Sequence, residues 1–454
     1  MRNMQSSPIP NGDRVHNPQY PSTIHANLTL ALLFLAYIFS FLDRQILALM
    51  VGPVRASLHI TDFQMSLLQG FSFSLFFVAA GLAIGRMADR YRRTWIIAAG
   101  IFLWCLMTAA SGFATSFLLL FIARMGLGVG EAALAPAGFS LLADSFKPNR
   151  LVRATSIFSL GSLLGGGFAY FIGGAMIEWL SQTPRPLNIL NLEPWQMAFV
   201  CASIPGLLIV PAVLMLPEPP RLGLLDEPRQ TLSEALAYLW ARRGIYMPLF
   251  ACSALLGIAN YGGLAWFPTH LMRTFAMGPL EAGSILGLIQ VTGSIVGTLV
   301  GAGLTEYFQS HGRRDAHLLT VTIMSLGIAA GLCACFMPDI AGTLILWSIA
   351  VVCLSAYFGS IIAALQLVTP NSMRASTSAI LLMISSLCGL GLGTALIGAV
   401  ADVFFADRSY GIGYALAIVA IPAALLSAAV ARRYRSNFAQ ADDTIAPSMP
   451  ESVA

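Results

Sequence analysis

The sequence contains little charge for its length. Only 10% of its 454 residues are Asp, Glu, Lys or Arg, whereas soluble domains carry about 25%. Apolar residues make up 57%, and the mean hydropathy is +0.76. Because a soluble surface needs charged groups to stay dispersed, this composition excludes a set of soluble domains. The net charge of +4 is not gathered on a polar domain, which argues against nucleic acid as a partner.

The loops also lack cysteine, and the apolar segments lack catalytic pairs. All seven cysteines lie within apolar segments, whereas a disulfide framework would place them in exposed loops. Cys333 and Cys335 form C-A-C without histidine partners, so neither a metal site nor a cofactor is expected. The six histidines lie in tails or near the ends of apolar segments, away from any nucleophile at membrane depth. We therefore predict no enzyme and no catalytic residues.

Long apolar runs are what the sequence has in excess. A stretch of about 20 apolar residues can cross a bilayer as a helix. Twelve stretches qualify, at 26–50, 62–86, 94–115, 117–143, 152–180, 196–217, 246–272, 280–308, 317–337, 341–369, 374–402 and 411–431. The first 25 residues are polar and carry no cleavable signal pattern. The prediction is an all-α integral membrane protein with twelve transmembrane helices.

Basic residues fall mostly on one side of these spans. With the N-terminus inside, nineteen of the 25 Lys and Arg residues lie in cytoplasmic segments, as the positive-inside rule requires. We therefore expect both termini in the cytoplasm, and the short loops favour a bacterial inner membrane. A polar stretch with a capping-box signal, T-L-S-E at 231–234, separates six spans from six. The expected domains are a tail (1–25), a six-helix bundle (26–217), a linker with a short amphipathic helix (218–245), a second six-helix bundle (246–435) and a tail (436–454).

The two halves share a sequence pattern. The motif P-N-x(2–3)-R-A-[ST], in which two or three residues separate Asn from Arg, begins at Pro148 and again at Pro370. A glycine-rich stretch follows each copy. Both spans then end in an acid, Glu178 and Asp402. Such a repeat predicts two pseudo-symmetric halves, the architecture in which secondary transporters rock one half against the other around a central site. We expect the protein to act as a monomer.

The segment after the second span carries the most specific motif. Gly85, Asp89 and Arg90 match the pattern G-x-x-x-D-[RK]-x-G-x-[RK]-[RK], whereas Arg92 replaces its internal glycine and Thr94 replaces a basic residue, which Arg93 supplies one position earlier. This resembles the loop 2–3 signature of the major facilitator superfamily. The resemblance implies the major facilitator fold of twelve helices.

The same motif predicts a gate on the cytoplasmic side. An acid at a membrane face can lie against the positive N-terminus of a neighbouring helix, which for Asp89 is the eleventh span, near Arg374. A weaker counterpart places Glu306, at the end of the eighth span, against the start of the fifth near Arg153. Both pairs would hold the cytoplasmic side shut. The alternative, that the basic residues only obey the positive-inside rule, leaves the two acids unexplained.

Few charged side chains lie at membrane depth. They are Asp43 and Arg44 in the first span and Arg124 and Glu131 in the fourth. A charge at a helix centre costs about 2.5–3.5 kcal/mol, so a cluster that only joined helices would be replaced by neutral packing. A carboxylate that exchanges an arginine partner for a proton would couple transport to proton movement. We assign this role to Glu131, with the other three completing the proton-coupling set.

The fourth span is also the basis of a narrower resemblance. It reads R-M-G-L-G-V-G-E-A-A over 124–133, and with F-L-D-R at 41–44 and A-D-S-F at 143–146 it resembles the spinster branch of the superfamily. The resemblance implies a secondary transporter of an amphiphile with a charged head group, such as a lysolipid or sphingosine 1-phosphate. Arg124 would then also bind the head group, because a guanidinium suits phosphate, and Glu131 is the second candidate substrate ligand of this half.

The second half offers only weakly polar side chains within its spans. Asn260, Tyr261 and Gln366 are candidate substrate ligands, although such residues also serve as hydrogen bonds between helices. This half could accept a hydrocarbon tail. The alternative function is a proton-coupled carrier of small organic anions such as sugar acids, and drug efflux and a membrane sensor are weaker alternatives. The expected partners are the substrate, protons and membrane lipids.

Overall fold

The computed structural model describes residues 20–88, 90–182, 192–221, 232–370, 373–406 and 408–445. Within these residues the regular structure is helical and contains no strand. Twelve helices are long and apolar enough to cross a membrane: Thr23–Leu49, Asp62–Ala88, Arg93–Gly112, Phe117–Ser145, Asn149–Gln182, Pro194–Leu214, Arg243–Thr274, Pro279–Ser310, Ala316–Phe336, Ile340–Leu367, Ser376–Phe404 and Gly411–Arg433. Each overlaps one predicted stretch, so the predicted all-α, multi-pass membrane fold is confirmed.

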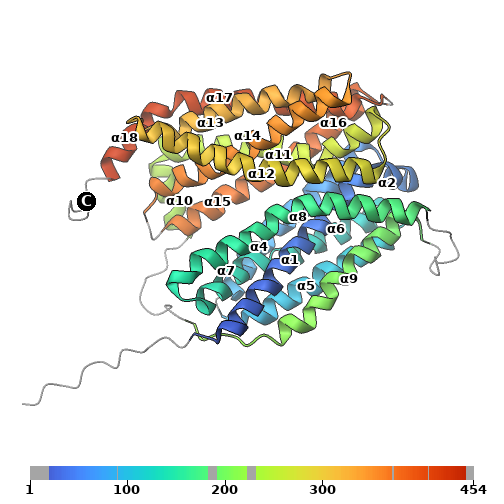
Figure 1. Cartoon of the computed structure of the whole chain (residues 1–454), viewed down its shortest axis with the longest axis horizontal. Coiled ribbons are helices and arrows are strands. Elements are labelled where there is room, and N and C mark those ends of the chain that lie inside the picture. The colour runs from blue at the N-terminus through green and yellow to red at the C-terminus, as the bar shows by residue number, and fades with distance from the viewer. Residues whose placement is uncertain are drawn as a thin grey trace, which may run out of the picture.

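The first half of the chain forms one bundle, the lower one in Figure 1. Its elements are α1 (Thr23–Leu49), α2 (Val51–Leu58), α3 (Asp62–Ser66), the π-helical segment η1 (Leu67–Phe71), α4 (Ser72–Ala88), α5 (Arg93–Gly112), α6 (Phe117–Glu131), α7 (Leu134–Ser145), α8 (Pro148–Gln182) and α9 (Pro194–Leu214). The linker helix α10 (Leu232–Ala241) follows. We call the end of the molecule beside α10 the linker face and the opposite end the far face.

The second half forms the upper bundle in Figure 1. Its elements are α11 (Arg243–Thr274), α12 (Pro279–Ser310), α13 (Ala316–Gly331), the 3-10 segment η3 (Leu332–Phe336), α14 (Ile340–Leu367), α15 (Arg374–Ser386), the π-helical segment η5 (Leu387–Gly393), α16 (Thr394–Phe404), α17 (Gly411–Arg433) and α18 (Arg435–Ile445). Between the bundles, α8 packs along α12, α1 contacts α11, and the second span contacts the eleventh through η1 with η5 and α3 with α16.

The fourth predicted span is broken in the structure, and the break fixes the position of Glu131. The α6 helix ends at Glu131, and α7 starts at Leu134. Pro136 has no amide hydrogen to donate to the carbonyl of Ala132, and its ring clashes with that carbonyl in a regular helix. The apolar stretch 117–143 predicts one continuous helix, and Pro136 explains why the helix is broken.

Close approach of the two halves depends on glycine at mid-membrane. A Cβ atom added to Gly70 in η1 would lie 1.8 Å from the carbonyl oxygen of Leu390 in η5. In the other interface, a Cβ atom on Gly287 of α12 would lie 2.7 Å from the carbonyl oxygen of Gly167 in α8. Any side chain at these positions would push the helices apart, since small residues are what allow membrane helices to touch.

Carboxylates join the halves at the far face. Asp402, at the end of the eleventh span, accepts hydrogen bonds from the backbone N–H groups of Asp62 (3.0 Å) and Phe63 (2.7 Å), where the second span begins. Arg273 of α11 donates both terminal nitrogens to Asp62, each at 2.8 Å. Glu178 lies beside the start of α12, because a Cβ atom on Gly278 would be 3.7 Å from its Oε2. The two acids that end the repeated spans therefore occupy equivalent places.

The two bundles diverge toward the linker face. Figure 1 shows them close together at the end that holds α2 and α16, and further apart at the end that holds α7 and α15. Cross-bundle hydrogen bonds among the described residues include Tyr170 Oη to the carbonyl of Leu264 at 2.5 Å, in addition to the far-face contacts. The described structure is therefore held together from the membrane centre to the far face.

Loss of the Asp402 carboxylate is expected to loosen the far face. A hydrogen bond to a charged group contributes about 1.5–3 kcal/mol, so Asp402→Ala should raise the population of far-face-open molecules at least about tenfold. Spin labels at Ala56 and Val403, with the seven native cysteines replaced, would report this as a longer component in the distance distribution. Asp339→Ala is the matched control, because Asp339 caps α14 within one half. Equal distributions in all three proteins would contradict the assignment.

Candidate transport site

The structure brings Glu131 and Arg44 together at the centre of the first bundle. Arg44 Nη2 of α1 donates to Glu131 Oε2 in an ion pair. Ser40, one turn before Arg44, donates its hydroxyl to the same oxygen at 3.0 Å. The Glu131 side chain is 1% exposed and that of Arg44 is 16% exposed. The carboxylate is thus enclosed, while its cationic partner borders the space between the halves.

Aromatic rings support the Arg44 guanidinium on its other side. Its Cζ lies 4.8 Å from the ring centre of Phe41 and 4.4 Å from that of Phe73. Cation–π contacts of this kind contribute about 2 kcal/mol or more when they are desolvated. These rings stabilise the cation independently of Glu131, so Arg44 has a place to remain when the carboxylate is neutralised.

Arg124 lies in the same charged cluster but forms no ion pair with Glu131 among the described residues. The seven-residue spacing places Arg124 and Glu131 on nearly one face of α6, but Glu131 is paired with Arg44 of another helix. Arg124 Nη1 donates to the backbone carbonyl of Asp43 at 3.1 Å, and its Cζ lies 4.5 Å from the ring centre of Phe199. The four predicted charges therefore do form one cluster across α1 and α6, with the pairing set by packing between helices.

Several polar atoms of this cluster have no hydrogen-bond partner among the described residues. They are Asp43 Oδ1, Glu131 Oε1, Arg44 Nε, and Nε and Nη2 of Arg124. Asp43, Arg124 and Glu131 are all at most 3% exposed. Leaving a buried polar group unsatisfied costs about 1–3 kcal/mol, and more for a charged one. The cluster therefore retains binding capacity for protons or for a polar ligand, and its acids and bases balance in charge.

The predicted substrate ligands of the second half lie in three different places. Tyr261 of α11 lines a cavity of about 30 Å³ together with Arg44. Asn260 lines a separate cavity of about 10 Å³ with Gln290, inside the second half. Gln366 is exposed near the linker-face end of α14, and its backbone carbonyl accepts a hydrogen bond from Arg374. Only Tyr261 joins the charged cluster.

The predicted gate residues do not form one contact. Asp89 lies outside the described residues, and Gly85 and Arg90 lie at the linker-face end of the second span and just after it. Glu306 and Arg153 are both exposed, and no hydrogen bond or ion pair joins them in the described part of the chain. Arg374 donates Nε to the carbonyls of Gln366 and Thr369, at 3.0 and 3.2 Å, which caps α14 within one half.

Arg93 holds the first bundle to the linker. The residue is 1% exposed and pairs with Asp144 of α7 and with Glu218, the latter through Nε at 2.8 Å. Glu218 also accepts hydrogen bonds from the backbone N–H groups of Arg93 and Thr94, at 3.2 and 3.1 Å, where α5 begins. All these groups belong to the first half and the start of the linker. In the structure Arg93 therefore joins parts of one half and, among the described residues, makes no hydrogen bond or ion pair between the halves.

The ionised form of Glu218 is stabilised by these donors. Partial burial by itself would raise the pKa of the carboxyl, but the hydrogen bonds from Arg93 and from the backbone of Thr94 and Arg93 outweigh it and lower the pKa below its ordinary value near 4.5. A carboxylate at the start of α5 also meets the positive end of the helix dipole. The sequence does not reveal this site, because Glu218 lies in a polar linker and its partner Arg93 is far away along the chain.

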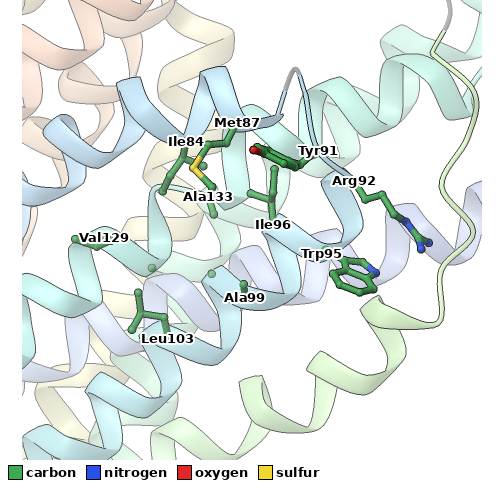
Figure 2. Close-up of a pocket in the computed structure, with 12 residues that line it drawn as sticks. Ile84, Met87, Tyr91, Arg92, Trp95, Ile96, Ala99, Leu103, Val129 and Ala133 are labelled. Carbon is green, nitrogen blue, oxygen red and sulfur yellow. The ribbon is translucent and has the colours of Figure 1, made fainter.

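An apolar groove lies on the outer side of the first bundle. It has a volume of about 550 Å³ and runs between α4, α5 and α6. Figure 2 shows Ile84, Met87, Leu103 and Val129 around it, with Trp95 and Arg92 toward one end. Its lining includes Gly130, the residue before Glu131, but no carboxylate. The groove is suited to lipid chains, and its lining residues Tyr91 and Arg92 do not belong to the charged cluster.

No group of three or more potential metal ligands occurs among the described residues.

Comparison with known proteins agrees with this architecture. The model of the Major Facilitator Superfamily matches residues 33–390. Protein spinster homolog 1 of Xenopus laevis is 26% identical over 398 residues, which cover 83% of this chain and 73% of that protein. The sphingosine-1-phosphate transporter SPNS2 of Danio rerio is 24% identical over 318 residues, or 66% of this chain and 60% of that protein. An MFS-type efflux pump of Mycolicibacterium smegmatis is 24% identical over 399 residues, or 86% of this chain and 88% of that protein.

Solved structures show the same relationship. A bacterial homologue of the human lysosomal transporter spinster, in an inward-facing and unoccupied conformation, has a TM-score of 0.77 at 25% identity and covers 95% of this chain and 100% of that chain. A D-xylose–proton symporter has a TM-score of 0.69 at 14% identity, covering 89% and 97% of the two chains, and shows the shared fold alone.

The Glu218 site makes stability depend on pH in a defined direction. Because the pKa is lower in the folded protein, ionisation contributes stability above the unfolded pKa, and this contribution is lost as the pH falls through the folded pKa. Glu218→Gln should therefore lower the thermal midpoint by a few degrees at pH 7, and the difference from the parent should shrink below about pH 4.5. Thermal unfolding in detergent measures both values.

Glu306→Gln serves as the control for this experiment. Glu306 is an exposed carboxylate near the same linker face, and exposed charges contribute little. A midpoint difference for Glu218→Gln that does not shrink as the pH falls from 7 to 3 would contradict the role of its ionised form.

Proposed function

Since the chain belongs to the Major Facilitator Superfamily, we propose that it is a proton-coupled secondary transporter of an amphiphile with an anionic head group. The observation that carries this proposal is the ion pair of Arg44 with Glu131, enclosed at the membrane centre and facing the second half. Its relatives include an MFS-type efflux pump, spinster proteins and a sphingosine-1-phosphate transporter.

Coupling follows from the exchange of partners at Glu131. When Glu131 is ionised, its charge is balanced by Arg44 and it accepts the hydroxyl of Ser40. When a proton neutralises Glu131, the guanidinium loses its ionic partner but keeps its aromatic supports. Arg44 is then the cation available to an anionic ligand. Proton and substrate thus affect the same charge, which is the requirement for linked binding.

Lipid-like substrates fit the distribution of polarity between the two halves. The half-buried Arg44 and the buried Arg124 lie in the first half, and guanidinium groups bind phosphate or carboxylate well. The described spans of the second half present no comparable charged pair at this depth and are lined mostly by apolar side chains. An anionic head would therefore lie against the first half, with its hydrocarbon tail toward the second.

Alternating access supplies the transport step. The halves contact one another from mid-membrane to the far face and diverge at the linker face, and a similar solved structure is described as inward-facing. We propose that the linker face is cytoplasmic, in agreement with its excess of Lys and Arg. Rocking of the halves would break the Asp402 contacts and close the linker face.

Glu131→Gln is expected to uncouple transport from protons. The amide keeps the size of the side chain but cannot ionise, so liposome uptake driven by a pH gradient should fall to the level of protein-free liposomes. Exchange of labelled substrate at equal concentrations should persist, because it needs no net proton movement. Glu281→Gln, which removes an exposed carboxylate in the first turn of α12, is the matched control. Gradient-driven accumulation by Glu131→Gln would show that the coupling assignment is wrong.

The substrate class is tested by comparing two anions in the same liposomes. With an imposed pH gradient, the parent protein should move a lysolipid phosphate and discriminate against a sugar acid, because a sugar acid gains nothing from the apolar second half. Uptake is measured with labelled compounds, with and without the gradient. Preference for the sugar acid would support the organic-anion alternative, for which the same Glu131 and Arg44 would serve. If uptake by the parent protein is the same with and without the pH gradient, the protein is a uniporter.

A further inference from the structure

A small cavity with both polar and apolar lining lies between the two halves beside the ion pair. It has a volume of about 30 Å³, enough for one or two small polar groups. The first half contributes Arg44, Gln45 and Gln69 to its lining, and the second contributes Tyr261 and Leu390. Because both halves form its walls, the cavity exists in this form only while they are in contact.

Gln69 is the unusual member of this lining. The residue is 8% exposed, and neither its Oε1 nor its Nε2 has a hydrogen-bond partner among the described residues. Arg44 Nε, on the same cavity, is likewise without one. A buried amide without partners costs about 1–3 kcal/mol for each unsatisfied group. A polar group that enters this cavity can supply the missing hydrogen bonds.

The local backbone places Gln69 at the interface. The residue belongs to the π-helical segment η1, which packs on the π-helical segment η5 of the second half. A π-helical turn contains an extra residue and changes the direction of its side chains, and such turns are frequent at functional sites. Gly70, the next residue, permits the approach to the Leu390 carbonyl. The amide is therefore held against the second half by the closest contact in this interface.

We propose that Gln69, with Arg44 and Tyr261, forms a subsite for a hydroxyl or amine that neighbours the anionic group of the substrate head. This inference rests on the proposed transport function and names the chemistry of its substrate. Arg44 only donates hydrogen bonds and so takes the anionic oxygen. The amide of Gln69 donates through Nε2 and accepts through Oε1, which matches a group that is both donor and acceptor, or an amine donor.

The small volume assigns only part of the head group to this subsite. A cavity of about 30 Å³ accepts the hydroxyl or amine but not a whole phosphate with its glycerol or sphingoid carbons. The anionic group would lie at the Arg44 edge. A ligand that occupies both positions would touch η1 and α11 at once, and so would favour the closed contact of the halves that the structure shows.

The test compares two probes that differ by one hydroxyl. These are 1-acylglycerol 3-phosphate, which has a free hydroxyl, and its 2-deoxy analogue, both measured in gradient-driven uptake into liposomes. Gln69→Leu should raise the KM for the hydroxylated probe about tenfold and leave that for the deoxy probe unchanged, since a site built to bond a hydroxyl rejects the analogue that lacks it. The ratio of the two KM values does not depend on the amount of folded protein.

Matched variants make the result decisive. Gln290→Leu removes a half-buried glutamine whose amide donates to Ser294 within the second half, and it should not change the KM ratio. Gln69→Met, which is closer in shape to glutamine, should repeat the effect of Gln69→Leu if the latter is unstable. Equal KM ratios in the parent and both Gln69 variants would overturn the subsite while leaving the proposed function intact. If the parent transports neither probe, the proposed function and the subsite fail together.

Discussion

The whole arrangement depends on an ion pair that is kept in a bilayer. A charge at membrane depth is expensive unless a partner of opposite sign lies beside it, and here Arg44 and Glu131 satisfy each other across two helices of one bundle. Ser40 and the rings of Phe41 and Phe73 complete the support. Because either charge is destabilised if the other is neutralised, a proton at Glu131 changes what Arg44 can bind. In the proposed mechanism, that local change alters the contact between the two halves.

The backbone around the pair is irregular where function requires it. Pro136 ends α6 so that Glu131 stands at a helix break. The π-helical segments η1 and η5 meet at mid-membrane, with Gly70 against the carbonyl of Leu390. At the far face, Asp402 binds the first backbone amides of the second span. The close approach and the far-face contacts thus lie along the interface between the halves, which Arg44 borders from within the first bundle.

The sequence predicted what depends on composition and missed what depends on packing. Apolar runs located all twelve spans, because hydrophobic length is a local property. The cost of buried charge identified Asp43, Arg44, Arg124 and Glu131. Which arginine pairs with Glu131 depends on how α1 packs beside α6, and helical spacing within one span could not show it. The sequence did not point to Gln69, to which we assign the proposed subsite, because an uncharged amide in an apolar run gives a weak signal. It did not point to the ion pair of Arg93 with Glu218 because these residues are distant in the sequence.

The most direct test of this account is the protonation state of Glu131 itself. Infrared difference spectra of the purified protein, recorded across a pH titration with and without substrate, show the carbonyl stretch of a neutral carboxylic acid. The account predicts a protonated-carboxyl band that is absent in Glu131→Gln and whose midpoint moves when substrate binds, since proton and substrate affect the same Arg44. If Glu131 remains ionised at every pH and the spectrum does not change when substrate binds, the ion pair is structural and the central claim is contradicted.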